Sequence, residues 1–322
     1  MKKRILSAAG RKEELRLATP KMIGDYRAQR LACKKLVEIG AGIGSQTLAF
    51  SRTCSEVIAV EKNPQSVSTL VNNTKDAQNI IVIEGDIFSD DILSKIKGAD
   101  VYFCDPSRPL EEKERTIANV SPKPEELVKF NPLAIEMPPQ LPPEKIPYDA
   151  EKEYISVECR LNRLTLYFGR LKKHNISVVS LPSGEKITDE EKPAKIQTGE
   201  SAKFIHEVDT AIIKAGLLPQ LVHKLGKLHI YSQGKYTILS SDIAVKNSFL
   251  RTYEIISKVN PDSIELNAEL RKKGFGKAVV HARILPSEYW QLRKTLERGL
   301  SGSETAHVFI NESEALITKL LQ

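Results

Sequence analysis

The chain has 322 residues, of which 41% are hydrophobic and 28% are charged, and its formal net charge is +7. This composition is typical of a globular protein with two domains, and no apolar run approaches the roughly 18 residues of a membrane-spanning helix. The N-terminus is basic but lacks the apolar core of a signal peptide, so we expect a cytoplasmic protein that does not bind membranes.

The charge is unevenly distributed along the chain. Residues 1–34 hold ten Lys or Arg and three acidic residues, residues 35–185 are acidic overall, and residues 186–322 hold twenty Lys or Arg and sixteen acidic residues. Basic ends around an acidic middle favour RNA as a partner, although a solvated cationic surface is the alternative. The four cysteines form no C-x-x-C pair and the histidines show no metal-ligand spacing, which argues against a disulfide framework and a metal site.

The first predicted elements form a basic helical segment over residues 1–34, interrupted at Thr19-Pro20. Strands and helices then alternate, with strands predicted over residues 35–39, 56–60, 79–84 and 100–104 and helices over 45–52, 64–74 and 87–96. This alternation predicts a Rossmann-like, doubly wound α/β domain over residues 35–185. Its apolar strands suit burial on both faces of a parallel sheet.

The later part of the chain is less regular. A helix is predicted over residues 122–128, a strand over 133–137, and a β-pair over 154–158 and 163–168. The polar segment 184–199 is the predicted boundary to a smaller α+β domain over residues 200–322. In that domain, helices are predicted over 209–215, 217–225, 264–273 and 287–298, and strands over 228–232, 236–240, 249–257, 278–282 and 307–310.

The most informative motif is V-E-I-G-A-G-I-G at residues 37–44, on a predicted strand-to-helix turn. The acidic Glu38 two places before Gly40, Gly42 and Gly44 suits a nucleoside with a charged amino-acid tail, namely S-adenosylmethionine (SAM). The dinucleotide fingerprint G-x-G-x-x-G would instead place its third glycine at position 45, which is Ser45. A nicotinamide or flavin cofactor and a purely structural turn are the alternatives.

Further acidic residues follow the second and third predicted strands. Glu61 could accept hydrogen bonds from both ribose hydroxyls, with Lys62 beside it. Asp86 could accept from the adenine amino group, with the backbone of Ile87 on the ring, or it could only cap a helix. Since the carboxyl ends of parallel strands share one edge of a sheet, these residues are predicted to line one pocket.

The fourth predicted strand ends in D-P-S-R-P at residues 105–109. We predict that Asp105, Pro106 and Arg108 contribute to catalysis and that Asp105 also faces the cofactor. Methyl transfer needs near-linear placement of nucleophile, methyl and sulfur, so most of the catalysis is positioning. A carboxylate and rigid backbone carbonyls could hold a target amine there, whereas a simple turn is the alternative.

Two basic groups could bind the phosphates of a nucleic acid. The first precedes the glycine motif at helical spacing, could instead cap the cofactor pocket, and consists of Tyr26, Arg27 and Arg30. The second is a cationic turn that consists of Arg271, Lys272, Lys273, Lys277 and Arg283. A solvated basic surface is the alternative for both groups.

Together the runs E-I-G-A-G-I-G, V-E-K-N-P, E-G-D-I-F and D-P-S-R-P resemble those of class I SAM-dependent methyltransferases, over about residues 35–170. The resemblance implies a seven-stranded sheet whose last β-pair is antiparallel. It also implies that Glu38 and the glycine turn hold the methionine end of SAM, Glu61 the ribose and Asp86 the adenine.

Three further runs are similar to prokaryotic methyltransferases with a THUMP-like C-terminal domain. These are A-T-P-x-x-I-x-x-Y-R-A-x-R at residues 18–30, E-V-D-T-A-I-I-K-A-G-L at 207–217 and R-K-K-G-F-G at 271–276. Because domains of the THUMP type bind structured RNA, the resemblance implies an RNA-binding role for residues 200–322. D-P-S-R-P departs from the D/N-P-P-aromatic run of enzymes that methylate nucleobase amines. It is similar to a turn of RNA uridine C5-methyltransferases, but their catalytic cysteine is not evident here.

We therefore expect a SAM-dependent methyltransferase that acts on tRNA or rRNA by direct in-line transfer, with a guanine exocyclic amine as the candidate target. The alternatives are a methyltransferase for proteins or small molecules, and a non-catalytic RNA-binding protein with a vestigial SAM fold. The intact acidic set of Glu38, Glu61, Asp86 and Asp105 argues against the vestigial fold.

Overall fold

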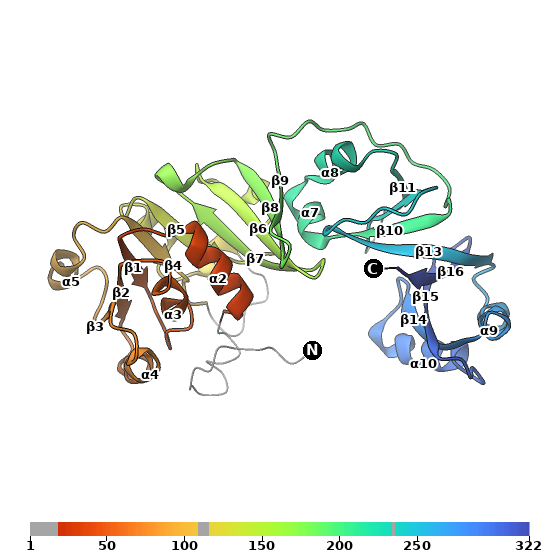
Figure 1. Cartoon of the computed structure of the whole chain (residues 1–322), viewed down its shortest axis with the longest axis horizontal. Helices are drawn as coiled ribbons and strands as arrows, with labels where there is room; N and C mark the ends of the chain where they lie inside the picture. Colours follow the sequence, from red (N-terminus) through yellow and green to blue (C-terminus); the bar gives the residue numbers. More distant parts are fainter. Residues whose placement is uncertain (1–18, 109–115, 234–235, 322) are drawn as a thin grey trace. The chain divides into compact units, whose positions relative to one another are not determined.

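The computed structural model describes residues 19–108, 116–233 and 236–321, and the chain divides into two compact units (Figure 1). Unit 1 comprises residues 1–190 and unit 2 comprises residues 191–322. The division falls within the predicted boundary segment, and the helical run predicted before Thr19 lies outside the described residues. No helix in the described ranges is both long enough and apolar enough to span a bilayer.

Unit 1 is built on a nine-stranded sheet with the order β3-β2-β1-β4-β5-β7-β6-β8-β9. Strands β1 to β5 are parallel to one another, and β7 is antiparallel to both β5 and β6. The strands are β1 (Lys35–Ile39), β2 (Glu56–Glu61), β3 (Ile80–Glu84), β4 (Val101–Cys104), β5 (Leu133–Met137), β6 (Glu151–Val157), β7 (Leu161–Tyr167), β8 (Ile176–Leu181) and β9 (Glu185–Thr188). The predicted Rossmann-like, doubly wound sheet is confirmed, and β8 and β9 extend it beyond the seven implied strands.

The helices of unit 1 are mostly shorter than predicted. They are α2 (Lys21–Arg30), α3 (Thr47–Phe50), α4 (Pro64–Thr74), α5 (Asp90–Lys95) and α6 (Pro124–Leu127). Only α4 matches its predicted bounds, because Pro64 occupies the first helical position and the Asn63 side chain accepts a hydrogen bond from the Gln65 amide. The predicted helices over 45–52, 87–96 and 122–128 begin or end in turns instead.

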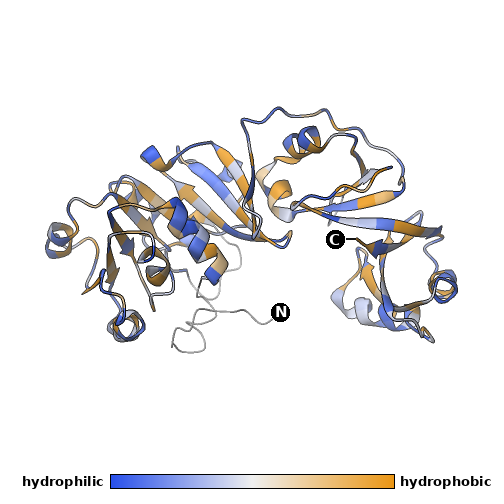
Figure 2. Cartoon of the chain, in the orientation of Figure 1, coloured by the Kyte–Doolittle hydropathy of each residue, from blue (hydrophilic) through white to orange (hydrophobic). Residues whose placement is uncertain are grey.

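Helix α2 belongs to the core of unit 1 and does not form a separate basic segment. Its Ala28 and Leu31 are buried with Phe50 of α3 and Phe103 of β4, whose rings lie edge to face with centroids 5.2 Å apart. Figure 2 shows that hydrophobic residues run along the strands of the sheet that these helices cover. The burial of apolar surface therefore holds α2 on the sheet, directly before the strand that leads to the glycine motif.

The structure brings Cys33 and Cys54 together, with their sulfur atoms 3.9 Å apart, and both are free thiols. They precede β1 and β2, which pair in parallel, so the starts of the two strands lie side by side. Because the two cysteines are far apart in the sequence, their spacing does not predict this contact. Among the described residues, no group of three or more His, Cys, Asp or Glu side chains could hold a metal ion.

Unit 2 contains a seven-stranded sheet with the order β11-β12-β10-β13-β16-β15-β14. Its strands are β10 (Phe204–Val208), β11 (His229–Ser232), β12 (Ile238–Ser241), β13 (Leu250–Val259), β14 (Phe275–His281), β15 (Glu304–Ile310) and β16 (Ala315–Leu320). Its helices are α7 (Thr210–Ala215), α8 (Leu218–Leu225), α9 (Ser263–Lys272) and α10 (Pro286–Leu296). Leu266 and Leu270 of α9 and Leu296 of α10 pack with Ala278 and Val280 of β14 in one buried cluster. The sequence patterns predicted neither β10 nor β16.

Candidate functional site

The structure brings the predicted acidic residues to one edge of the unit 1 sheet. Glu38 lies near the end of β1 and Glu61 ends β2, while Asp86 and Asp105 follow β3 and β4. Strand β1 pairs in parallel with both β2 and β4, and the strand order reverses at β1 and β4. Ligands of such sheets bind at the carboxyl ends of the strands near this reversal.

The three glycines of the motif meet different requirements. Gly40, Gly42 and Gly44 all have positive φ, at 73°, 56° and 87°. A Cβ atom on Gly44 would lie 2.6 Å from Cδ1 of Leu70, so this glycine also permits close packing against α4. Among the described residues, and apart from its chain neighbours, no atom lies within 4 Å of the Cβ position of Gly42, so the described part of the chain leaves this backbone open to a ligand.

Glu61 connects the second strand to the glycine turn. Its Oε2 accepts a hydrogen bond from the amide of Gly42 at 2.9 Å, and its Oε1 accepts from the amide of Asn63 at 2.8 Å. The side chain is only 9% exposed. Two backbone amides therefore hold the carboxylate beside the open face of Gly42.

Glu38 is buried beneath the same turn, and its Oε2 accepts a hydrogen bond of 2.5 Å from the Thr47 hydroxyl. Burial raises the pKa of Glu38 to about 8, although the bond from Thr47 opposes the shift. A cationic ligand group close to this carboxyl would favour its ionised form.

Asp86 makes a local turn contact and does not cap α5, whose N-cap residue is Ser89. Its Oδ1 accepts a hydrogen bond from the Phe88 amide at 2.9 Å, in the turn before α5, and the residue remains exposed. Lys62 is exposed and the side chain of Ile87 is buried. The exposed Asp86 carboxylate has a further lone pair for a ligand, so the predicted adenine contact stays a prediction.

The turn after β4 runs beside the glycine motif. The backbone oxygen of Asp105 lies 3.9 Å from the Cβ position of Gly40, and Pro106 is buried next to it. Removal from water and then the negative charge of Glu136 raise the pKa of Asp105 to about 7. Because Asp105 retains an exposed surface, solvent screens part of this effect.

A pocket of about 230 Å³ opens beside this turn. It is lined by Pro20, Arg108, Glu136, Pro139, Gln140, Leu161, Asn162 and Arg163. Its volume lies below the roughly 300–1,000 Å³ of ordinary ligand pockets, so it suits one ring system better than a whole nucleotide. Of the predicted catalytic residues, Arg108 lines this pocket. Pro109, the last residue of the D-P-S-R-P run, lies outside the described residues.

Sequence reasoning missed a buried charge network between the glycine motif and this pocket. The Arg27 guanidinium is fully buried, pairs with Glu136 at 2.7 Å and donates to Oε1 of Gln46 at 2.9 Å. It also lies 4.8 Å from the ring centroid of Phe103, and Glu136 pairs with Arg163 at 2.6 Å. A signal for this network was available, since Glu136 is a charge within the otherwise apolar strand L-A-I-E-M.

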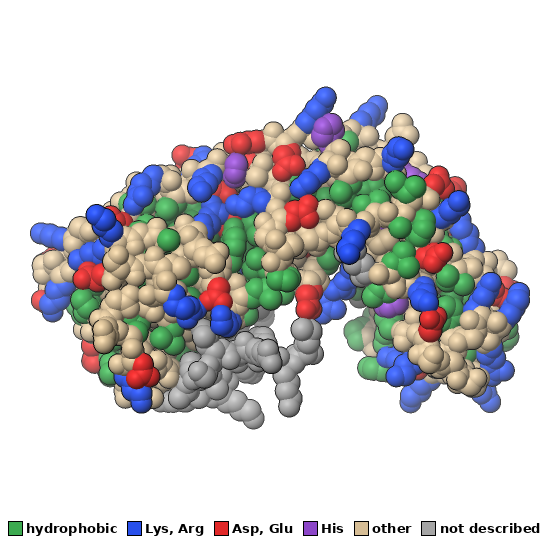
Figure 3. All heavy atoms as spheres, viewed as in Figure 1, with side chains coloured by type: hydrophobic (Ala, Val, Ile, Leu, Met, Phe, Trp, Pro, Cys, Tyr) green, Lys and Arg blue, Asp and Glu red, His purple; other side chains and the backbone are tan. Residues whose placement is uncertain are grey.

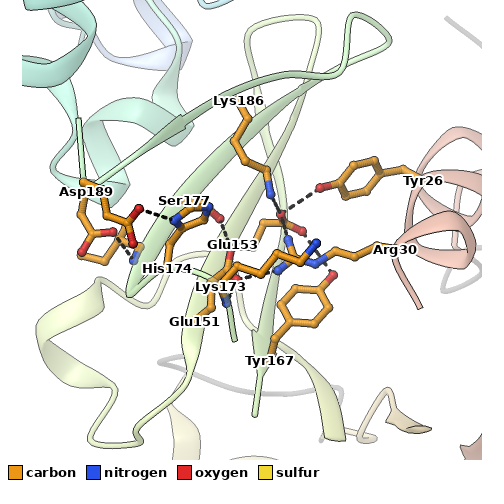
Figure 4. Close-up of polar contacts among 12 residues, drawn as sticks. Tyr26, Arg30, Glu151, Glu153, Tyr167, Lys173, His174, Ser177, Lys186 and Asp189 are labelled. Atoms are coloured by element: carbon orange, nitrogen blue, oxygen red, sulfur yellow. Dashed lines mark hydrogen bonds and ion pairs between the residues drawn. The ribbon is translucent and has the colours of Figure 1, made fainter. Parts of the chain in front are cut away.

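The structure corrects the phosphate-binding hypothesis for Tyr26, Arg27 and Arg30. Figure 4 shows Tyr26 and Arg30 pointing from α2 toward two acidic residues of β6. Arg30 pairs with Glu151 at 2.6 Å and also with Glu153, which accepts a hydrogen bond from the Tyr26 hydroxyl at 2.8 Å. Both carboxylates are fully buried, so these cations hold α2 against the sheet and leave no free charge for a phosphate.

The second predicted basic group is exposed, but its members differ in their contacts. The Arg271 guanidinium donates to the backbone oxygen of Arg298 at 2.9 Å, in the turn that follows α10. Two lysines of the group, Lys272 and Lys273, lie within 3.5 and 3.7 Å of the acidic residue Glu269. Two further members have no ion-pair partner within the described part of the chain, namely Lys277 and Arg283.

Comparison with known proteins gives short sequence matches only, and no protein-family profile matches the chain. A stretch of 76 residues is 34% identical to ribosomal RNA small subunit methyltransferase A of Streptococcus uberis and 33% identical to the protein of the same name from Streptococcus mutans. Each match covers 24% of this chain and 25% of the relative. The chain thus spans about a quarter of the length of these curated relatives.

One solved structure resembles nearly the whole chain. It is the crystal structure of a protein from Porphyromonas gingivalis W83 that is named, provisionally, a methyltransferase. The superposition has a TM-score of 0.77, covers 97% of this chain and 83% of the other, and has 18% sequence identity. At this identity the likeness concerns the fold. The chain therefore has the Rossmann-like fold of SAM-dependent methyltransferases, followed by a smaller α+β unit.

Proposed function

We propose that this protein is a SAM-dependent methyltransferase that acts on RNA, either tRNA or rRNA. The observation that carries the cofactor assignment is the pairing of the Glu61 carboxylate with the Gly42 amide, next to open backbone. Carboxylates that follow successive parallel strands suit a ligand with an ammonium group, two ribose hydroxyls and an adenine amine. The residues present therefore fit SAM, which would supply an activated methyl group.

The cofactor roles follow from the place of each residue on the sheet edge. Glu38 would hold the ammonium of the methionine end, next to the backbone of Gly40 and Gly42. Glu61 would accept from the ribose hydroxyls, and Asp86 would accept from the adenine amine with the backbone of Ile87 on the ring. Lys62, which is exposed beside Glu61, would contribute charge only.

The acceptor would enter the pocket lined by Arg108 and Asn162. There Asp105 and the rigid backbone at Pro106 would hold an amine so that its lone pair points at the methyl carbon. Bound SAM would supply the methyl group by direct transfer to that nitrogen, with S-adenosylhomocysteine as the leaving product. Asp105, with its raised pKa, could take the proton that the amine loses. The pocket volume suits one nucleobase ring system, and we propose the exocyclic amine of guanine as the candidate target.

RNA as the acceptor has two independent supports. The curated relatives that match part of the chain are named ribosomal RNA methyltransferases. Unit 2 presents an exposed basic surface, and we propose that it is a THUMP-like domain that binds structured RNA.

Calorimetry with SAM tests the cofactor assignment. Glu61→Ala should weaken binding by about 1–3 kcal/mol through lost charge-assisted hydrogen bonds. Glu56→Ala is the matched control, because Glu56 starts the same strand at the opposite edge of the sheet and pairs with Lys35. Equal losses for the two variants, or no SAM affinity in the wild type, would contradict the assignment.

Transfer of labelled methyl groups to total RNA, total protein and small molecules tests the acceptor. We expect label in RNA alone, identified as a methylguanine by nucleoside mass spectrometry, and a loss of at least about tenfold in Asp105→Asn. Label in protein or small molecules would favour the second class of methyltransferase. RNA binding without any transfer would instead favour a vestigial fold.

A further inference from the structure

Helix α10 of unit 2 presents an aromatic surface that the proposed catalytic site does not use. Trp290 is the only tryptophan of the chain, and it is 61% exposed. Its ring stands edge to face with that of Tyr289 at 5.4 Å, and the Arg293 guanidinium lies 5.6 Å from its centroid. Large aromatic rings exposed beside arginine are typical of binding surfaces and not of inert ones.

The charge of this region singles out the kind of partner. Residues 263–299 hold eight Lys or Arg and four acidic residues, whereas the rest of residues 186–322 holds twelve of each. The whole positive excess of the C-terminal region therefore lies within residues 263–299, which comprise α9, β14, α10 and the turns that follow them. Figure 3 shows Lys and Arg side chains gathered over the part of unit 2 that carries α9 and α10.

Two acidic residues, one in α10 and one at its C-cap, are already engaged within unit 2. Glu288 accepts a hydrogen bond from the Leu285 amide at 3.1 Å, at the start of the helix. Glu297 accepts from the Ala278 amide at 2.9 Å and from Arg293 at 3.0 Å. Their negative charges are thus directed at backbone and side-chain donors of unit 2.

Two exposed cations near Trp290 have no such engagement. Lys294 follows Trp290 by four residues and so shares its face of α10, whereas Arg298 is exposed in the turn that follows the helix. These three residues are called the stripe. Within the described residues, neither cationic group has an ion-pair partner. An exposed indole with free cations beside it matches a strand whose bases can stack and whose phosphates are charged.

We infer that the stripe formed by Trp290, Lys294 and Arg298 binds single-stranded RNA, with the indole stacked on an unpaired base and the two cations near the flanking phosphates. The inference rests on the proposed function for its choice of RNA as the partner. It adds that unit 2 reads an unpaired base through this face of α10.

Intrinsic fluorescence of the full chain tests the stacking directly, because Trp290 is the only tryptophan. Titration with a short single-stranded oligoadenylate should quench the emission to saturation, and the affinity should fall as salt rises from about 50 to 200 mM. With dye-labelled oligoadenylate, Trp290→Ala should bind roughly 5- to 150-fold more weakly. Ile264→Ala on α9, which removes a side chain that is 77% exposed, is the control and should leave the affinity unchanged.

A second variant tests the electrostatic part of the inference. Lys294→Ala should lower the slope of log affinity against log salt by about one, because one phosphate contact is lost. Unchanged emission with bound oligoadenylate, or equal affinities of Trp290→Ala and Ile264→Ala, would overturn the inference. A blue shift of the Trp290 emission with anionic phosphatidylserine vesicles, together with no change in emission with oligoadenylate, would also overturn the inference.

The methyl-transfer assay separates this inference from the proposed function. Quenching by RNA without methyl transfer would contradict the proposed function and support the stripe as an RNA-binding surface. Methyl transfer to RNA by the wild type, without quenching, would support the function and refute the stripe.

Discussion

Replacing Arg27 by Met should destabilise unit 1 by about 3 kcal/mol. The change removes a fully buried guanidinium and leaves the carboxylate of Glu136 and the amide of Gln46 without their shared partner. Met keeps much of the apolar stem that packs over Phe103, so the loss reports mainly on charge and hydrogen bonding.

The magnitude follows from what remains around Glu136. Removal of one partner of a buried ion pair costs about 3–5 kcal/mol, since an uncompensated charge is left inside the protein. Here Arg163 still lies 2.6 Å from Glu136 and is 22% exposed, so the lower end of the range applies. For a unit of this size, that loss corresponds to a decrease in Tm of about 6–12 °C.

Denaturant unfolding followed by two signals checks this prediction. Far-UV circular dichroism reports on both units, whereas fluorescence of Trp290 reports on unit 2. The circular dichroism midpoint of Arg27→Met should decrease while the fluorescence midpoint stays constant. Lys95→Met is the control, because its exposed pair with Asp91 should contribute less than about 1 kcal/mol. Equal losses for the two variants would refute the assignment of Arg27 as a buried clamp.

Two further predictions concern the glycine motif and its buried acid. Gly44→Ala should destabilise unit 1 by about 2–5 kcal/mol, because it combines a positive φ with a contact of 2.6 Å to Leu70. Gly98→Ala is the control, because Gly98 has a similar φ and no described atom within 4 Å of its Cβ position. Thermal unfolding should show a destabilisation of only about 1–2 kcal/mol for this variant, and equal losses for the two variants would contradict the packing argument. Glu38 has a folded-state pKa of about 8 against an ordinary value of 4.5, so its contribution is fully present below about pH 4.5 and is lost as pH rises to 8. Glu38→Gln should abolish that loss, and parallel stability–pH curves for variant and wild type would contradict the prediction.

The sequence correctly predicted the position of the acidic residues on the sheet, because spacing along one strand and its following turn decides that position. Glu38, Glu61, Asp86 and Asp105 lie near, at or just after the end of an apolar strand, and parallel strands must bring such ends together. Gly44 was recognisable for a similar reason, since strand-to-helix turns need backbone that other residues rarely adopt. These features depend on the spacing of apolar residues along a strand and on the residues of the turn that follows it.

The sequence was a poor guide to short strands with polar residues. Strand β10 contains His206, which is buried and bonded through its two ring nitrogens to Ser241 and Thr252. A polar residue in a short run weakens the strand pattern, and only the partners across the sheet explain its burial. Strands β8, β9 and β16 were missed as well, and the predicted helices ran too long where turns satisfy the backbone.

Local pattern thus determined the α/β alternation, the glycine turn and the acidic edge, because each depends on residues a few positions apart. Only the tertiary structure decided that Arg27 and Arg30 are internal clamps. Their carboxylate partners lie 109 residues away for Arg27 and 121 and 123 residues away for Arg30. A basic helix face looks the same in sequence whether it meets solvent, phosphate or buried glutamates, and the strand order settles which of these it meets.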